Sequence, residues 1–400
     1  MHRGPTGRFE KSMYGGELVK AFIPASLPPS PPLDLSVLQK PLERASLAVG
    51  RLDSVSTLLP ETALFLYTYV RKEAVLSSQI EGTQSSLSDL LLFELEEAPG
   101  VPIDDVVEVS SYVAAMELGI TRLRDGFPIS SQLLCEIHRT LLSHGRGNKQ
   151  EPGEFRRSQN WIGGTRPGHA IFVPPPHEEV SGCMEELERF LHDDSDGIPV
   201  LIKAALAHVQ FETIHPFLDG NGHVGRLLVT LYLSAAGLLQ EPLLYLSLFL
   251  KQHREEYYRL LMSCREEGDW ESWVSFFLEG VATTADEAVR TAQSLVRAFE
   301  SDALRIRGLG RQAGSVLRVH EVLKSRPLAK LPDVQRWTGL SYPAAASAME
   351  RLRELGIVRE LTGKKRNRVF VYSTYLESLT KEDNLGTDSG RRTLGHAQTQ

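Results

Sequence analysis

The sequence has little cysteine. Its 400 residues contain only Cys135, Cys183 and Cys264, which are far apart and form no C-x-x-C pair. This excludes a disulfide scaffold and a cysteine-based zinc finger, and it favours a reducing, cytoplasmic location. The first residues lead into no apolar segment of the signal-peptide type. The strongly apolar stretches are also far shorter than a membrane span, so we expect no membrane association.

Charge is distributed unevenly along the chain. The whole chain carries a net charge of -7, but residues 311–375 contain 13 Lys and Arg against 5 Asp and Glu. This segment is therefore net +8 and the remainder is net -15. With 42% hydrophobic residues over 400 positions, two or three domains are expected. The sequence predicts a basic module attached to an acidic body, with different roles for the two.

Helical periodicity dominates the body of the chain. Residues 1–35 are interrupted by Gly and Pro and predict an extended arm over the protein surface, with an SH3-type ligand as the alternative. Two short β-prone runs around a Gly-rich turn predict a hairpin within residues 155–176. The regular alternation of strand and helix that a doubly wound sheet requires is absent. Apolar spacing predicts helices at residues 38–59, 61–80, 104–124, 131–143, 178–192, 199–212, 222–236, 247–265 and 270–305.

The densest polar segment is H-P-F-L-D-G-N-G-H-V-G-R, residues 215–226. It contains a formal G-x-G-x-x-G pattern, but a dinucleotide site needs a buried strand before it, and residues 201–212 are Ala-rich and helical. A zinc cluster of His208, His215, His223 and Asp219 is disfavoured, because Pro and Gly interrupt the helical spacing. A di-iron site would need a second E-x-x-H helix, which the sequence lacks. A simple turn explains the glycines but not the clustered polar residues.

A phosphate site accounts for all of these residues. Asn221 and Gly222 open a helix whose free N–H groups attract an anion. Asp219 can hold Mg²⁺ against the same phosphates. Arg226 can reach a distal phosphate with its planar guanidinium, and His215 can accept the proton of an incoming hydroxyl. The segment therefore predicts a phosphate-transfer site.

The segment resembles the Fic family motif H-P-F-x-[D/E]-G-N-G-R-x-x-R, departing from it only at His223, where the family has Arg. The resemblance implies a mainly helical enzyme that transfers AMP from ATP to a Ser, Thr or Tyr hydroxyl of a target protein or of itself. It makes His215 the general base and Asp219 the Mg²⁺ ligand. Arg226 would bind the γ-phosphate, and His223 would offer a neutral imidazole in place of a permanent cation. The nucleotide-binding residues implied are Glu81, His215, Asp219, Gly220, Asn221, Gly222, His223, Gly225, Arg226, Tyr257 and Tyr258.

The resemblance extends over roughly residues 10–300. It makes the predicted hairpin a flap that registers a target segment, and it places Tyr257 and Tyr258 at the nucleotide base. Ser77–Gly82, S-S-Q-I-E-G, is similar to the family's inhibitory signature [S/T]-x-x-x-E-[G/N]. Glu81 would then pair with Arg226 and occupy the γ-phosphate position. This implies the group with an N-terminal inhibitory helix.

The basic segment, residues 311–375, predicts three helices and a β-hairpin, an order that resembles a winged helix. Its basic turn contains Lys364, Lys365, Arg366 and Arg368, which favour contact with DNA phosphates. The alternative is a module for protein contacts or dimerisation. Residues 376–400 are polar and Gly-rich and predict a disordered tail.

The predicted organisation is an arm at 1–35, a helical region with the inhibitory helix at 36–100, a Fic core at 101–300, the winged helix at 311–375 and the tail. The leading prediction is an autoinhibited protein adenylyltransferase, possible as a homodimer. Two alternatives stay open: a Fic-fold transferase with another phosphate-containing donor, and a nucleotide-sensing, DNA-binding transcription regulator.

Overall fold

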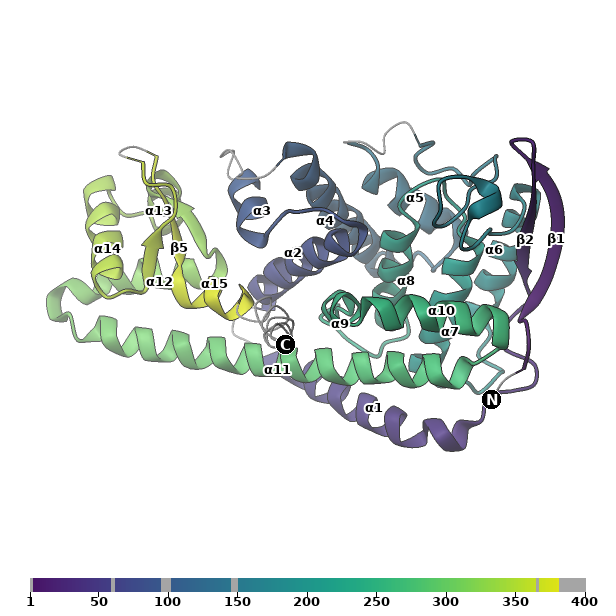
Figure 1. Cartoon of the computed structure of the whole chain (residues 1–400). Helices are drawn as coiled ribbons and strands as arrows, with labels where there is room; N and C mark the ends of the chain where they lie inside the picture. The colour runs from purple at the N-terminus through teal and green to yellow at the C-terminus, as the bar shows by residue number, and fades with distance from the viewer. Residues whose placement is uncertain (1–2, 59–61, 95–101, 145–149, 365–366, 381–400) are drawn as a thin grey trace, which may run out of the picture. The chain divides into compact units, whose positions relative to one another are not determined.

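The computed structural model describes residues 3–58, 62–94, 102–144, 150–364 and 367–380, and it is mainly helical (Figure 1). The chain forms two compact units: unit 1 is Met1–Ser54 with Tyr69–Asp286, and unit 2 is Val55–Thr68 with Glu287–Gln400. Within the described ranges, no helix is long and apolar enough to cross a bilayer.

Unit 1 contains a hairpin and a set of packed helices, and three of its helices (α1, α2 and α11) continue into the residues of unit 2. The elements are β1 (Gly7–Tyr14), β2 (Glu17–Pro24), α1 (Leu35–Leu58), α2 (Thr62–Glu81), α3 (Leu87–Glu94), α4 (Ile103–Arg124), α5 (Ser131–Leu141), a 3₁₀ turn η2 (Pro167–His169), α6 (His177–His192), α7 (Val200–Ile214), α8 (Asn221–Ala235), α9 (Ser247–Gln252), α10 (Arg254–Glu267) and α11 (Trp270–Arg307).

The helix predictions are confirmed within a few residues, with two corrections. The segment predicted as one helix at 247–265 forms two helices, because the helix is interrupted at His253 between α9 and α10. The short helix α3 was not predicted. Its start is marked by a reciprocal cap, in which Asp89 Oδ2 accepts from Ser86 N at 3.0 Å and Ser86 Oγ accepts from Asp89 N at 3.2 Å. That pair is a capping-box signal that the sequence contained.

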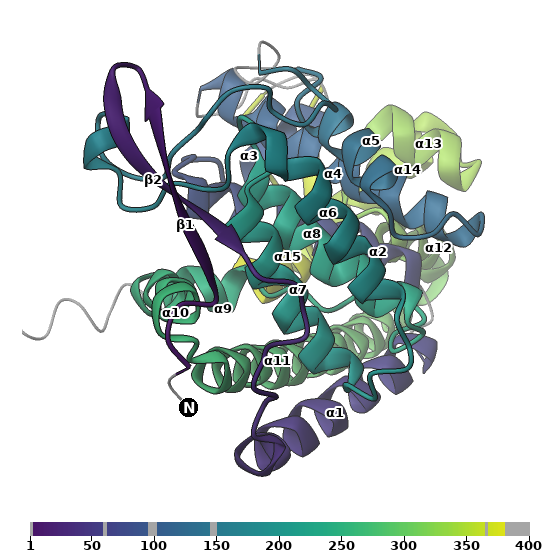
Figure 2. The same cartoon turned by 90° about the vertical axis from the view of Figure 1, so that its right-hand side faces the viewer.

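Helices α7 and α8 form the centre of unit 1 (Figure 2). Every residue from 201 to 214 is buried, and α8 is buried over almost its whole length. α6 packs on α7, while α4 and α5 pack on α8. A helix buried on all sides needs partners for its polar groups. Lys203 Nζ accordingly pairs with Asp196 at 2.9 Å, and Trp273 Nε1 donates to Ala205 O at 2.9 Å. The loop between α7 and α8 therefore has a rigid support at both ends.

The β-hairpin lies at the N-terminus and not where the sequence predicted it. β1 and β2 pair antiparallel from Gly7 opposite Pro24 to Tyr14 opposite Glu17. They turn at Gly15 and Gly16, whose φ values of +58° and +80° suit a two-residue hairpin turn. The prediction of an extended arm at 1–35 was therefore wrong over the hairpin residues.

The flap segment, residues 155–176, contains one isolated bridge, Ile162 to Phe172, where two strands were predicted. Its glycines at positive φ and its prolines, which lack an N–H, prevent a longer ladder. The segment packs against β2 instead: Phe22 N donates to Val173 O at 2.9 Å, and Val19, Ala21 and Val173 share a small core.

Unit 2 has the predicted order of helices and hairpin, with an additional strand, β3. Its three strands form an antiparallel sheet in the order β3-β5-β4. Lys364 is exposed in the turn between β4 and β5, and Arg368 lies over the Phe370 ring at 5.0 Å. Lys365 and Arg366 lie outside the described residues. The elements are η3 (Gly310–Gln312), α12 (Ala313–Ser325), β3 (Leu328–Lys330), α13 (Leu331–Thr338), α14 (Tyr342–Glu354), β4 (Val358–Glu360), β5 (Val369–Tyr372) and α15 (Ser373–Thr380).

Helix α15 extends into the segment that was predicted to be a disordered tail. Tyr375 and Leu376 are buried within unit 2, so the first residues of that segment belong to the folded part. The remaining residues, 381–400, lie outside the described part of the chain.

Candidate active site

The polar segment 215–226 forms a tight loop between α7 and α8. His215 ends α7 with a left-handed backbone (φ 50°, ψ 59°), and Gly220 precedes α8 with φ 76°. The Asn221 side chain fixes the loop between them: its Oδ1 accepts from Phe217 N at 2.9 Å and its Nδ2 donates to Phe217 O at 2.8 Å. Asn221 is therefore a loop-fixing residue, whose side-chain oxygen and nitrogen are both bonded to the Phe217 backbone.

Two buried side chains that the sequence analysis did not single out hold this loop from outside. His138 on α5 stacks on Phe217 with ring centroids 3.8 Å apart, and its Nε2 lies 3.0 Å from Asp219 O. Gly153 N donates to His138 Nδ1 at 2.8 Å, so Nδ1 is an acceptor and Nε2 carries the proton toward Asp219 O. Burial lowers the pKa of His138 to about 4, in keeping with this neutral form.

Arg156 is the second support. Its guanidinium donates to four carbonyl oxygens around the loop: His215 O from Nε at 3.0 Å, Pro175 O and Ile214 O from Nη2 at 2.6 and 3.4 Å, and Ser158 O from Nη1 at 3.2 Å. Burial lowers its pKa to about 10, which still leaves it charged at neutral pH. Arg156 thus ties the backbone of His215 to both ends of the flap segment.

We expect Arg156→Lys to destabilise unit 1 although the charge is kept. A lysine ammonium cannot reproduce the planar fork, so at least one buried carbonyl loses its partner. The expected loss is about 2–3 kcal/mol, the range for a hydrogen bond to a charged group. Urea unfolding measures it, with the exposed Arg157→Lys as the matched control. An equal midpoint for the two variants would contradict the role given to Arg156.

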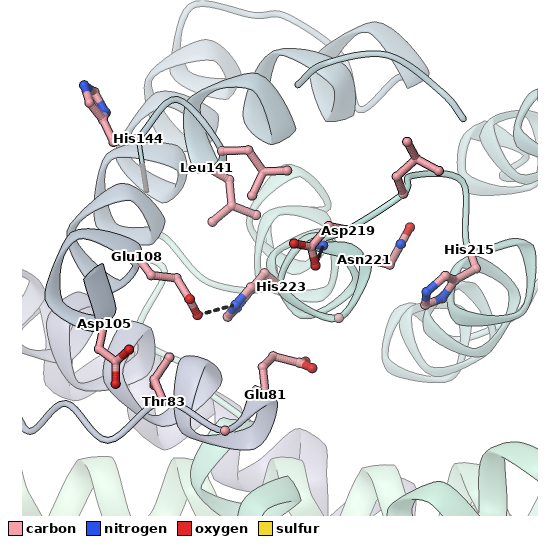
Figure 3. A pocket seen from close by; sticks show the side chains of 15 residues that line it. Glu81, Thr83, Asp105, Glu108, Leu141, His144, His215, Asp219, Asn221 and His223 are labelled. Atoms are coloured by element: carbon pink, nitrogen blue, oxygen red, sulfur yellow. Dashed lines mark hydrogen bonds and ion pairs between the residues drawn. The ribbon is translucent and has the colours of Figure 1, made fainter. Parts of the chain in front are cut away.

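A pocket of about 400 Å³ opens over the loop (Figure 3). Its walls come from four parts of unit 1: the end of α2, helix α4, the end of α5 and the loop itself. The pocket is lined by Glu81, Gly82, Thr83, Asp105, Glu108, Leu141, Leu142, His144, His215, Leu218, Asp219, Gly220, Asn221, Gly222 and His223. The first turn of α8 faces this space, so its N–H groups and the helix dipole favour an anion there.

His215 lies at one side of the pocket. Its Nδ1 is buried and has no hydrogen-bond partner among the described residues. Burial, together with repulsion from Arg265 and Arg156, lowers its pKa to about 3. At neutral pH the imidazole is therefore uncharged and can accept a proton.

Glu81, which lines the pocket, forms an ion pair with the buried Arg226, whose Nη2 lies 2.7 Å from Glu81 Oε1. Burial raises the pKa of Glu81, but attraction from Arg226 and the hydrogen bond from Arg226 hold it below its ordinary value. The carboxylate fills the space left by the missing side chain of Gly222, where an added Cβ would lie 2.2 Å from Glu81 Oε1. Glu81 thus occupies the anion-attracting position in front of α8.

Both ring nitrogens of His223 already have partners. Its Nδ1 lies 3.0 Å from Ser77 Oγ on α2. Its Nε2 lies 3.4 Å from Glu108 Oε1 on α4 (Figure 3). The ring is buried and meets the Tyr112 ring edge-on. A phosphate contact by His223 would require it to give up one of these partners.

The structure separates the two tyrosines. Tyr257 is buried, and its hydroxyl lies 2.9 Å from His208 Nε2, while His208 Nδ1 lies 3.0 Å from Gly225 O. Tyr258 is exposed, with Arg254 5.6 Å from the centre of its ring. Of the pair, only Tyr258 presents a ring at the surface.

Gly225 packs inside the helix pair and lies away from the pocket lining. A Cβ at Gly225 would lie 2.5 Å from Glu212 Oε1 and 3.2 Å from the Phe211 ring, so this glycine allows α7 and α8 to approach closely. Burial raises the pKa of Glu212 to about 7.

Asp219 is the carboxylate of the loop that could take part in metal binding. Its Oδ1 accepts from Gly220 N at 2.8 Å, and the residue lines the pocket. In the part of the chain that the structure describes, no three His, Cys, Asp or Glu side chains are grouped to hold a metal ion. A cation here would thus need most of its oxygen ligands from a bound anion and water, which suits Mg²⁺.

Comparison with known proteins identifies two matching segments. The Fic/DOC family N-terminal model matches residues 39–121, and the Fic/DOC family model matches residues 128–233. The chain is 32% identical over 255 residues to protein adenylyltransferase Fic of Culex quinquefasciatus, covering 60% of this chain and 47% of the relative. It is 34% identical over 188 residues to the protein of the same name from Drosophila ananassae, covering 47% and 35%. The chain therefore spans about half or less of these relatives.

Solved structures show the same fold. A Fic family protein from Desulfovibrio desulfuricans G20 superposes with a TM-score of 0.55 at 20% identity, covering 84% of this chain and 95% of that one. A variant of Fic-1 from C. elegans superposes with a TM-score of 0.50 at 24% identity, covering 67% and 74%. With both segments matched and the motif loop in place between α7 and α8, residues 39–121 are identified as a Fic/DOC family N-terminal domain and residues 128–233 as a Fic/DOC family domain.

Proposed function

We propose that this chain is an autoinhibited protein adenylyltransferase that transfers AMP from ATP to a hydroxyl group of a target protein or of itself. The observation that carries the proposal is the Glu81–Arg226 pair in front of α8, at the place where an anion would bind. The printed names of the relatives, protein adenylyltransferase Fic, support the same activity.

The chemistry uses groups that line the pocket, together with Arg226, which pairs with Glu81 of the lining. His215 accepts the proton of the target hydroxyl, whose oxygen forms a bond to the α-phosphorus of ATP. The bond from that phosphorus to the bridging oxygen breaks, and pyrophosphate leaves. The backbone N–H groups at the start of α8 hold phosphate oxygens, and Arg226 binds the γ-phosphate once Glu81 has moved aside. Asp219 would hold Mg²⁺, which when bound neutralises phosphate charge.

Tyr258 is the better candidate of the two tyrosines for contact with the base. Its ring is exposed, whereas the Tyr257 hydroxyl and ring are committed to the core. We propose stacking of the base on Tyr258 and a structural role for Tyr257.

The proposal is tested by incubating the full chain, as wild type and as Glu81→Gly, with ATP and Mg²⁺ and measuring intact mass. We expect a mass increase of one AMP group on the Glu81→Gly protein and little on the wild type. Binding of ATP by Glu81→Gly without any adduct, alone and with candidate target proteins, would favour the nucleotide-sensing alternative. Adducts from another phosphate-containing donor would favour the other enzyme alternative.

Unit 2 carries the second proposed function, contact with DNA through the turn between β4 and β5. Its support is the net charge of +8 over residues 311–375 and the exposed Lys364. The arginines near the end of α14 are neutralised locally, because Arg351 pairs with Glu354 and Arg353 with Glu350. We therefore propose that any DNA contact rests on the basic turn, with a cytoplasmic location and a dimer as further predictions.

A further inference from the structure

His223 joins three helices at the pocket wall. It lies in the first turn of α8, and its two ring nitrogens face Ser77 on α2 and Glu108 on α4, at 3.0 and 3.4 Å. Both partners belong to the N-terminal helices. The position where the family motif has an arginine is therefore used here to contact those helices.

The donors and acceptors of this network are consistent with one direction. Arg226 Nε can only donate, so Ser77 Oγ accepts from it, at 2.8 Å. The Ser77 hydroxyl has one proton of its own, and His223 Nδ1, at 3.0 Å, is placed to accept it. His223 Nε2 then carries the ring proton and faces the Glu108 carboxylate. In this arrangement Arg226 Nε, the Ser77 hydroxyl and His223 Nε2 each face an acceptor.

Ser77 holds the Arg226 guanidinium independently of Glu81. Its hydroxyl accepts from Nε at 2.8 Å and its carbonyl oxygen accepts from Nη2 at 3.2 Å, while Glu81 shares only Nη2, at 2.7 Å. When Glu81 is displaced, the two contacts to Ser77 can keep the guanidinium in place. With its own proton directed to His223, the Ser77 hydroxyl presents a lone pair to Arg226 Nε.

We propose that His223 is a positioning residue: it orients the Ser77 hydroxyl so that Arg226 stays where it meets Glu81 of the pocket lining, and it does not bind the nucleotide phosphates itself. This rests on the proposed function, in which Arg226 binds the γ-phosphate. An arginine at position 223 would have donors only, so it could not accept from Ser77, and it would place a second cation beside Arg226.

Two substitutions of His223 by amide side chains distinguish the roles of its two ring nitrogens. In His223→Asn the amide oxygen can take the position of Nδ1 and accept from Ser77, whereas in His223→Gln the longer side chain places its amide near the position of Nε2. Calorimetric titration of ATP with Mg²⁺ into the full chain in the Glu81→Gly background compares them. We expect His223→Asn to keep the Kd within about twofold, and His223→Gln and His223→Arg to weaken it about tenfold, the scale of one hydrogen bond to a charged group.

Tighter ATP binding by His223→Arg would overturn the proposal and make residue 223 a direct phosphate ligand. Equal affinities for His223→Asn and His223→Gln would overturn it as well. Thermal unfolding of each variant shows whether a weaker Kd comes from lost folding. If it does, Ser77→Ala, which removes the hydroxyl alone, provides the test and should reproduce the tenfold loss of ATP affinity.

A second readout needs no nucleotide, so it separates this inference from the proposed function. Long-range ¹H–¹⁵N spectra of the wild-type chain, with His223 assigned by its loss in His223→Asn, report which ring nitrogen carries the proton. We expect a proton on Nε2 and none on Nδ1. A proton on Nδ1, alone or in a doubly protonated ring, would overturn the proposal because Nδ1 could not then accept from Ser77. If Glu81→Gly fails to bind ATP, the proposed function fails. The protonation state of the His223 ring would still show whether Nδ1 can accept from Ser77.

Discussion

Replacing Glu81 with glycine should raise self-modification by about ten- to a hundredfold, the range that corresponds to losing one charge-assisted hydrogen bond that competes with the substrate. In the resting structure Arg226 Nη2 is paired with Glu81 Oε1 at 2.7 Å, and the carboxylate fills the space in front of Gly222. Without it, that space and one guanidinium edge become available to the γ-phosphate. Incorporation of AMP from radiolabelled ATP into the full chain measures the change.

Two further substitutions at the same position test the physical cause. Glu81→Gln keeps the shape and removes the charge, so it should activate in part if charge matters. Glu81→Asp shortens the side chain by one methylene group and should also activate in part. A Glu81→Gly protein that folds normally, binds ATP and stays as inactive as the wild type would show that this pair does not restrain the reaction.

Replacing His215 with alanine should lower the transfer rate of the Glu81→Gly protein by about 10²- to 10⁴-fold, the usual contribution of a general base. ATP affinity should change little, because the phosphates are held by the start of α8 and by Arg226. Rates and calorimetric Kd values for the two proteins separate these effects. A loss of affinity as large as the loss of rate would make His215 a binding residue and not the base.

The pH dependence gives an independent check on His215. The base acts in its neutral form, and burial lowers its pKa from 6.5 to about 3. Protonation therefore removes the active form only in acid, and the rate of the Glu81→Gly protein should stay level from about pH 8 to about pH 5. A decline with a midpoint near the ordinary value of 6.5 would contradict the burial of this imidazole.

The sequence by itself determined the helical class and most helix boundaries, and it predicted which segment carries the chemistry. Periodicity located helices such as α6 because one buried face opposite an exposed one leaves a strong pattern, whereas α7, buried on all sides, was recognised as an Ala-rich apolar segment. The motif segment 215–226 and Glu81 could be singled out because their residue types suit phosphate binding and because they resemble a long family motif. Gly15-Gly16 and the Ser86–Asp89 cap were also readable signals, although the hairpin and α3 were not predicted from them.

Only the tertiary structure decided which groups meet. Ser77 and Arg226 are 149 residues apart, and His138 and Asp219 are 81 apart, so no local pattern could join them. The burial that lowers the pKa of His215 and commits Tyr257 to the core depends on how the helices pack around α7 and α8. The same packing brings Ser77 and Glu108 to the two nitrogens of His223, because a hydrogen bond is set by distance and direction in space and not by separation along the chain.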